Sequence, residues 1–152
     1  MVDSNAQCAK KKNDNFYHEI MMDSAGFVST FSKDPDKKVG SIITSHNKLI
    51  SSGYNKIPDS IKIDNKKSLS KENKLKLTVH AEVNAILNAE ESLEGATLYT
   101  TFPCCSVCSL WIIQAGITTV VYPKLTKDSS WKESIETAKE NFRLANVTLI
   151  EL

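Results

Sequence analysis

Three cysteines, Cys104, Cys105 and Cys108, lie close together in the sequence, and His80 and Glu82 precede them. A Cys-x-x-Cys pair lets two sulfurs reach one ion from a tight turn, and imidazole is a common further zinc ligand. Three protein ligands leave the fourth tetrahedral position for water, as in catalytic zinc sites. Zinc lowers the pKa of that water, and a carboxylate beside the metal can carry protons. The spacing therefore predicts His80, Cys105 and Cys108 as zinc ligands and Glu82 as the catalytic residue.

Cys104 is an alternative ligand, because it lies four residues before Cys108 and could share a helix face with it. The two-residue gap that recurs in zinc sites favours Cys105 instead. A fourth protein ligand, such as His18 or His46, would turn the site into a structural one. The interpretation adopted is an open site with Cys104 packed beneath it.

Two helices must bring these side chains together. Residues 80–91 predict a helix that begins at His80 and Glu82, and residues 105–115 predict a second helix that ends at Gly116. At a helix start the unpaired N–H groups and the positive end of the dipole favour thiolate over thiol, as a zinc ligand requires. Two helices that start at the same edge of a sheet would place the imidazole and both sulfurs at one point.

The remaining elements predict an α/β domain with three layers. Apolar spacing indicates helices over 16–31 and 130–145 and strands over 39–45, 49–54, 96–101, 118–123 and 147–152. The first two strands read as an antiparallel hairpin, and the helix before each later strand favours parallel pairing. A five-stranded mixed sheet with helices on both faces is the simplest packing. Residues 1–13 predict a disordered tail, residues 14–152 a single domain, and residues 55–77 a long lysine-rich loop with about one turn of helix.

Composition limits location and partners. The chain has 152 residues, of which 41% are hydrophobic and 24% charged, as is usual for a soluble domain. It shows no apolar run of membrane-spanning length and no apolar signal-peptide core, so a cytoplasmic protein without membrane contact is predicted. Net charge is +1, split as +5 over residues 1–77 and −4 over 78–152. A small anionic partner therefore fits better than nucleic acid, whose binding surfaces are rich in arginine.

The motifs resemble one family in their order and spacing. They are SKDPDKKVGSII (32–43), GYNKIP (53–58), TVHAEVNAILNA (78–89), EGATLYTT (94–101), the cysteine segment and IIQAGITTVVYP (112–123). His-x-Glu followed by Cys-x-x-Cys is the signature of zinc-dependent nucleobase deaminases. From about residue 16 to the C-terminus the sequence resembles the deoxycytidylate (dCMP) deaminase family of the cytidine deaminase-like superfamily.

The resemblance implies a fold, a reaction and substrate contacts. The fold would have sheet order 2-1-3-4-5, and the reaction would be zinc-dependent hydrolysis of dCMP to dUMP and ammonia, which supplies dUMP for dTMP synthesis. The family pattern places its first cysteine at Cys105. Asn55 would contact the substrate, and Ala81 would offer its backbone N–H to the pyrimidine carbonyl.

Two departures from the family pattern concern the phosphate. Lys56 and Asp59 stand where related sequences often have glycine and arginine. Lysines would then hold the phosphate as point charges, and the candidates are Lys38, Lys56, Lys74 and Lys76.

Other functions remain open from the sequence. A deaminase of this fold could act on cytidine, dCTP or tRNA, although the lack of arginine disfavours tRNA. A non-catalytic zinc-stabilised interaction module is an alternative of another class. The apolar residues 110–113, LWII, favour a homo-oligomer.

Overall fold

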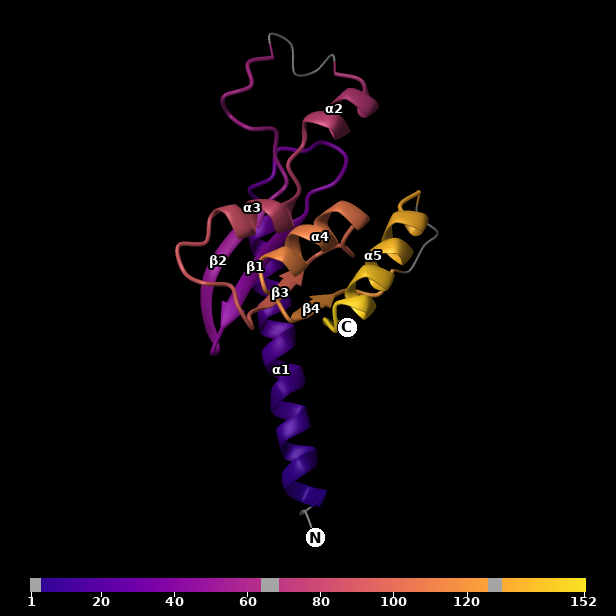
Figure 1. Cartoon of the computed structure of the whole chain (residues 1–152). Coiled ribbons are helices and arrows are strands. Elements are labelled where there is room, and N and C mark those ends of the chain that lie inside the picture. The colour runs from indigo at the N-terminus through magenta and orange to yellow at the C-terminus, as the bar shows by residue number, and fades with distance from the viewer. Residues whose placement is uncertain (1–3, 64–68, 126–129) are drawn as a thin grey trace.

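The computed structural model describes residues 4–63, 69–125 and 130–152, with side chains from Asp14 onward. The helices and strands follow one another as α1 (Ser4–Ser29), β1 (Gly40–Ser45), β2 (Lys48–Tyr54), α2 (Lys71–Leu77), α3 (Ala81–Leu87), β3 (Thr97–Thr100), α4 (Ser106–Gln114), β4 (Thr119–Tyr122), α5 (Lys132–Leu144) and β5 (Thr148–Glu151). Figure 1 shows their arrangement. In the described residues no helix is both long enough and apolar enough to cross a lipid bilayer.

The strands form one five-stranded sheet in the order β2-β1-β3-β4-β5. β1 runs antiparallel to both β2 and β3, whereas β3, β4 and β5 run parallel. Parallel neighbours need a crossover connection, and α4 and α5 supply the two that this sheet requires. The predicted mixed sheet and its order are confirmed.

Helices cover both faces of the sheet, as predicted. α1 crosses one face, and α3, α4 and α5 cover the other (Figure 1). Because side chains alternate along a strand, neighbouring residues of the central strands face opposite layers. Ile42 and Tyr99 pack with Ala25 of α1, whereas Ile43 and Leu98 belong to the core on the opposite face.

The hairpin between β1 and β2 turns at His46 and Asn47. Both residues have positive φ, 48° and 61°. A two-residue hairpin turn of this kind matches the right-handed twist of the flanking strands, and asparagine tolerates the left-handed backbone better than most residues. The predicted antiparallel hairpin is confirmed.

The N-terminal segment differs from the predicted disordered tail. Helix α1 starts at Ser4, so residues 4–13 are helical, and this part of α1 projects beyond the sheet (Figure 1). The segment AQCAKKK (6–12) is built from residues that are mostly strong helix formers. Extending an existing helix costs far less than nucleating one, so the packed part of α1 favours a helical extension.

The long segment after β2 holds more helix than predicted. Helix α2 spans Lys71–Leu77, and the side chain of Ser70 caps it by accepting a hydrogen bond from the Asn73 N–H at 3.2 Å. Residues 64–68 of the predicted loop lie outside the described residues. Lys56 and Val79 form an isolated antiparallel bridge that closes the two ends of the segment.

Candidate metal centre and active site

The predicted ligands lie at the starts of two helices. His80 immediately precedes α3 and Cys105 immediately precedes α4, both with extended backbone. The Cys105 sulfur accepts a hydrogen bond from the Cys108 N–H at 3.4 Å and so caps the first turn of α4. Because the N–H groups at a helix start carry partial positive charge, this position favours a thiolate.

Close backbone contact at Gly53 fixes α3 against β2. A Cβ atom at Gly53 would lie 2.2 Å from the Ala85 nitrogen and 2.6 Å from the Ala81 carbonyl oxygen. Only glycine allows this approach. The Asn84 side chain adds a hydrogen bond from its Nδ2 to the Tyr54 carbonyl at 2.8 Å. These contacts fix the start of α3, and therefore His80 and Glu82, relative to the sheet.

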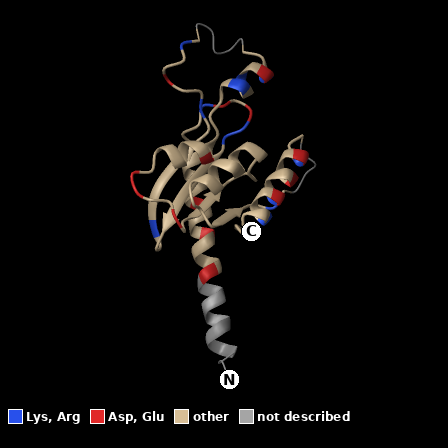
Figure 2. Cartoon of the chain, viewed as in Figure 1, with Lys and Arg blue, Asp and Glu red and all other residues tan. Residues whose placement is uncertain are grey.

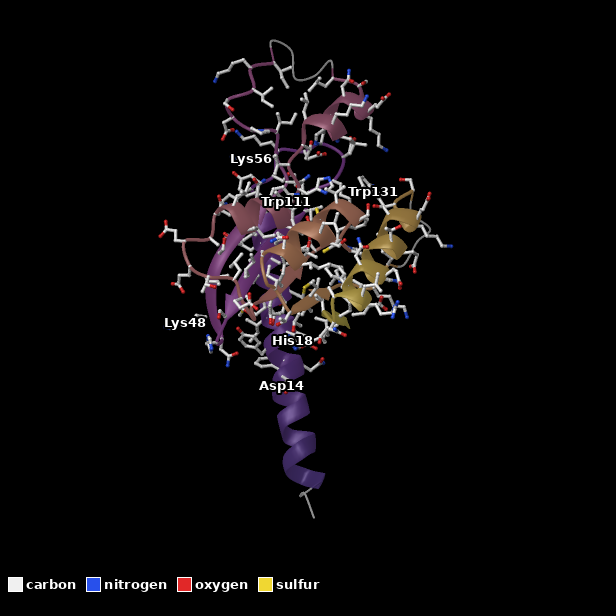
Figure 3. All side chains as sticks on the ribbon, in the orientation of Figure 1. Asp14, His18, Lys48, Lys56, Trp111 and Trp131 are labelled. Carbon is white, nitrogen blue, oxygen red and sulfur yellow. The ribbon has the colours of Figure 1, made fainter. Side chains whose placement is uncertain are left out.

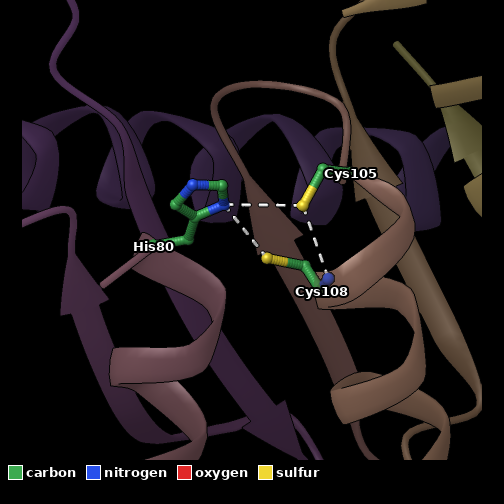
Figure 4. A group of neighbouring side chains, drawn as sticks. All are labelled: His80, Cys105 and Cys108. Atoms are coloured by element: carbon green, nitrogen blue, oxygen red, sulfur yellow. Dashed lines mark hydrogen bonds between the residues drawn. The ribbon is translucent and has the colours of Figure 1, made fainter. Parts of the chain in front are cut away.

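His80, Cys105 and Cys108 form a group of possible metal ligands, with their donor atoms all within 4.8 Å of one another. Figure 4 shows the His80 Nδ1 facing both sulfurs, at 3.5 Å from Cys105 Sγ and 3.3 Å from Cys108 Sγ. A tetrahedral zinc with ordinary Zn–N and Zn–S bonds would separate the nitrogen from each sulfur by about 3.5 Å. The donor set therefore fits zinc in both chemistry and spacing, with His80 Nδ1 as the ligand nitrogen.

The pKa values of the two thiols shift in opposite directions. Hydrogen bonds from Cys108 and then His80 lower the pKa of the Cys105 thiol to about 4, although burial opposes them. The pKa of the Cys108 thiol is raised because it donates to Cys105, because it is buried and because Glu82 is near. The hydrogen bond to Cys105 raises the pKa of His80. A divalent cation would stabilise both sulfurs as thiolates.

Glu82 lies beside this group without belonging to it. Only 4% of the residue is exposed, and its Oε2 is 3.7 Å from Cys108 Sγ. Burial raises the pKa of its carboxyl above the ordinary value. A carboxylate with a raised pKa can both accept and return a proton near neutral pH.

Cys104 is buried and lies outside the ligand group, as its predicted place beneath the site requires. Its thiol interacts with the Glu82 carboxylate through a hydrogen bond. Burial and the Glu82 charge keep the pKa of this thiol well above its usual range. Its place outside the group of donor atoms that lie within 4.8 Å of one another is what separates Cys104 from the predicted ligands.

A cavity of about 860 Å³ opens over these residues. We call His80, Ala81, Glu82 and Cys105 its floor; all four line the cavity. We call the charged residues that line its outer part the mouth: Asp34, Asp36, Lys37, Lys71, Lys74 and Lys124. The volume lies within the range of small-molecule sites.

Asn55 and Ala81, two predicted substrate contacts, both line the cavity. Asn55 also holds the backbone around it, because its Oδ1 accepts from the Val39 N–H at 2.8 Å and its Nδ2 donates to the Lys37 carbonyl at 2.9 Å. The Nδ2 group keeps one further N–H. Ala81 is the first residue of α3, where backbone N–H groups have no partner within the helix.

Lys38, the third predicted substrate contact, does not line the cavity, whereas the neighbouring Lys37 does, although both residues are exposed. Of the other predicted phosphate lysines, Lys56 pairs with Asp59 at 2.8 Å and Lys76 with a glutamate of its own helix, and neither lines the cavity. The sequence prediction missed Lys37 because two adjacent lysines carry no signal that tells which one faces inward.

Lys74 lines the mouth, but two carboxylates already bind it. Its ammonium pairs with Asp34 at 2.8 Å and with Asp36. Figure 2 shows acidic and basic segments close together where α2 meets the loop that precedes β1. Burial raises the pKa of Asp34, but the hydrogen bonds from Lys74 and from the Lys37 and Asp36 N–H groups outweigh it, so the net shift is downward.

The two tryptophans have different environments (Figure 3). Trp131, at the start of α5, lines the cavity and contacts the His80 ring edge-to-face with centroids 5.9 Å apart. Trp111 on α4 is 47% exposed and Leu110 58%, whereas Ile112 is fully buried. The homo-oligomer inferred from this run stays a prediction.

The comparisons with known proteins agree with this geometry. A family model described as the cytidine and deoxycytidylate deaminase zinc-binding region matches residues 12–124. Mouse deoxycytidylate deaminase is 33% identical over 154 residues, which cover 95% of this chain and 84% of the mouse protein. An uncharacterized deaminase from the luxG 3′ region of Aliivibrio fischeri is 40% identical over 125 residues, which cover 81% and 84% of the two chains.

A solved structure supports the same relationship. The dCMP deaminase of cyanophage S-TIM5, in complex with dCMP and dUMP, superimposes with a TM-score of 0.73 and 26% identity over 88% of this chain and 95% of the phage protein. The predicted family resemblance is therefore confirmed in sequence and in fold. The chain is a deaminase and belongs to the cytidine and deoxycytidylate deaminase family, whose shared region binds zinc.

Proposed function

We propose that this protein is a zinc-dependent dCMP deaminase that hydrolyses dCMP to dUMP and ammonia. The observation that carries the proposal is the group of His80, Cys105 and Cys108 with the buried carboxyl of Glu82 beside it on one cavity floor. The choice of dCMP is supported by the relatives named deoxycytidylate deaminase and by the phage enzyme that binds dCMP and dUMP.

His80 Nδ1 and the sulfurs of Cys105 and Cys108 would hold the zinc. When bound there, the metal supplies a water molecule of lowered pKa. Glu82 takes a proton from the attacking water, delivers it to N3 of the cytosine, and helps to protonate the departing amino group. The C4–N bond breaks, a C4–O bond forms, and one water is consumed for each ammonia released. A single carboxyl can serve these steps because burial raises its pKa.

The base is oriented by groups at the cavity wall. The backbone N–H of Ala81 at the start of α3 has no partner within the helix and can donate a hydrogen bond to the pyrimidine carbonyl. The remaining Nδ2 hydrogen of Asn55 suits an oxygen of the sugar. Trp131 packs against the His80 ring and limits the access of water to that side of the floor.

A substrate panel tests the proposal. Purified zinc-loaded protein is incubated with cytidine, CMP, dCMP and dCTP, and the loss of cytosine absorbance is followed as uracil forms. We expect the highest kcat/KM with dCMP. A preference for cytidine or dCTP would replace dCMP by that substrate, and no turnover of any of the four would contradict the proposal. Metal analysis of the same sample should find one zinc per chain.

A further inference from the structure

The geometry points to Lys37 as the residue that binds the 5′-phosphate of the substrate, an inference that rests on the proposed function. We infer that this single lysine at the mouth separates nucleotides from nucleosides. Lys74, although it lines the same mouth, serves to hold the mouth together. Neither the family comparison nor the sequence motifs single out Lys37.

The side chain of Lys37 has a defined place in the cavity. Its ammonium lies 3.1 Å from the ring centroid of Phe102, and both residues line the cavity. A cation over an aromatic face is attracted by the ring but keeps its charge. An ammonium has three donors, and one ring face cannot occupy them all, so donors remain for an anion. Phe102 lies three residues before Cys105, so the ring ties the cation to the segment that carries the predicted ligands.

The backbone of Lys37 is also held on both sides. Its N–H donates to Asp34 Oδ1 at 3.0 Å, and its carbonyl accepts from Asn55 Nδ2 at 2.9 Å. The same Asn55 lines the cavity next to the floor. A binding residue whose position is fixed before the ligand arrives loses less conformational entropy on binding. Lys37 lies on an exposed loop, but its backbone is held by two hydrogen bonds and its ammonium by the Phe102 ring, so its position is largely preorganised.

Lys37 and Lys74 differ in the number of carboxylates that pair with their ammonium groups. Asp34 and Asp36 together bring two negative charges to the Lys74 ammonium, so a phosphate would have to displace a carboxylate to reach it. Within the described residues no carboxylate pairs with the Lys37 ammonium. Burial lowers the pKa of Lys37, which agrees with a cation that lacks an anionic partner. A phosphate dianion would supply that partner.

Two other mouth lysines, Lys71 and Lys124, are exposed, as Lys37 is, but they differ from it in their contacts. In the described part of the chain no side-chain contact fixes either ammonium. They can add a general positive potential, but an unfixed cation in water contributes little to a specific contact. We therefore expect their removal to weaken phosphate binding much less than the removal of Lys37.

The test compares two substrates that differ only in the phosphate. The kcat/KM values for dCMP and deoxycytidine are measured with the zinc-loaded wild type, Lys37→Gln and Lys38→Gln. Because a hydrogen bond to a charged group is worth a factor of roughly 10 to 100, Lys37→Gln should lower kcat/KM for dCMP by that factor, mainly through KM. The value for deoxycytidine should change less than twofold. Lys37→Arg should restore part of the loss.

Two matched variants control for other causes. Lys38→Gln removes the neighbouring charge, and Lys48→Gln removes one at the far hairpin (Figure 3). Neither should change the dCMP preference more than twofold. Calorimetric binding of dUMP and deoxyuridine repeats the comparison where turnover of deoxycytidine is too slow to measure. The assignment is overturned if Lys37→Gln loses as much kcat/KM with deoxycytidine as with dCMP, or as much affinity for deoxyuridine as for dUMP. A larger loss with dCMP in Lys38→Gln than in Lys37→Gln would also overturn it.

The proposed function and this inference fail separately. If the wild type prefers CMP over dCMP, the dCMP assignment fails, and the Lys37 comparison is made with CMP and cytidine instead. If the wild type prefers dCMP and Lys37→Gln behaves like the wild type, the function stands and the role of Lys37 is wrong. If the wild type does not distinguish nucleotides from nucleosides, both are wrong.

Discussion

The floor of the cavity comes from two helix starts, whereas its mouth comes from a loop, a short helix and charged side chains distant in the sequence. At the floor, His80 and Glu82 are two residues apart, and Cys105 lies three residues before its partner in the ligand group, Cys108. At the mouth, Lys74 reaches Asp34 across 40 residues. Short spacings on regular elements fix side-chain directions, and long-range ion pairs do not.

This difference suggests a division of labour within one site. The floor is buried and its pKa values are set by burial and by neighbouring sulfurs, so it suits the chemical step common to a deaminase family. The mouth is more exposed and depends on few contacts, so substitutions there can change the substrate without disturbing the metal site. Substitutions at the floor and at the mouth test whether the two parts of the site are separable in this way.

The largest effect is expected at the floor. Glu82→Gln keeps the size of the side chain but removes its ability to accept a proton. Activity on dCMP should fall by a factor of roughly 10² to 10⁴, while zinc content and Tm stay close to the wild type. Steady-state kinetics and metal analysis measure both. Glu91→Gln, at an exposed position beyond the end of α3, should leave activity unchanged. Full activity in Glu82→Gln would remove this residue from the mechanism.

Substitutions of two adjacent cysteines test which sulfurs bind the zinc. Cys105→Ser should lower zinc affinity at least tenfold, because a thiolate that faces His80 Nδ1 at 3.5 Å is replaced by a hydroxyl. Cys104→Ser should keep one zinc per chain, since Cys104 is outside the ligand group. Competition with a chromogenic chelator measures the affinity. Loss of zinc in Cys104→Ser with retention in Cys105→Ser would shift the ligand frame by one residue.

The sequence predicted the floor and the sheet because their signals are local. Apolar runs marked the strands, and Gly116 marked the end of α4, where φ is 81°. Two features of the chain could not be predicted this way. Whether Lys37 or Lys38 enters the cavity depends on hydrogen bonds of Lys37 to Asp34 and Asn55, which meet only in the folded chain.

The helical segment 4–13 was missed for a different reason. Its polar composition suggested disorder, but composition reports whether a segment can build a core of its own. This segment continues a helix that is already anchored on the sheet farther along, through residues such as Ala25 and Val28. Helix propagation then needs only residues of good propensity, which the segment has.

Two glycines test how closely the floor depends on backbone packing. Gly53→Ala would place a Cβ against the backbone of α3, and overpacking of this kind should lower stability by about 3 kcal/mol. Gly26→Ala, inside α1 where a Cβ meets nothing within 4 Å, should raise it by about 0.5–1 kcal/mol. Urea unfolding of both variants gives the comparison. A neutral Gly53→Ala would mean that α3 moves freely on β2.

The mouth should show a smaller stability effect with a pH signature. Asp34→Asn removes the carboxylate that binds Lys74 and should cost about 1–3 kcal/mol at neutral pH. The folded-state pKa of Asp34 lies below its ordinary value of 3.8, so its contribution is complete above that pH and is lost as pH falls through the lowered pKa. The stability difference between wild type and variant should therefore be constant from pH 5 to 7 and shrink below about pH 4. Chemical unfolding at several pH values measures it. A difference that grows on acidification would have the wrong sign.

The smallest effect is expected at Lys56, which the sequence placed among the phosphate lysines and the structure places outside the cavity lining. Its ammonium pairs with Asp59, whose side chain is 86% exposed, and exposed pairs contribute about 0–1 kcal/mol. Lys56→Gln should therefore change KM for dCMP less than twofold and Tm by about a degree or two. Kinetics beside Lys37→Gln make the contrast direct, since both variants remove one positive charge. A KM increase as large as that of Lys37→Gln would mean that net charge around the mouth, and no defined contact, attracts the phosphate.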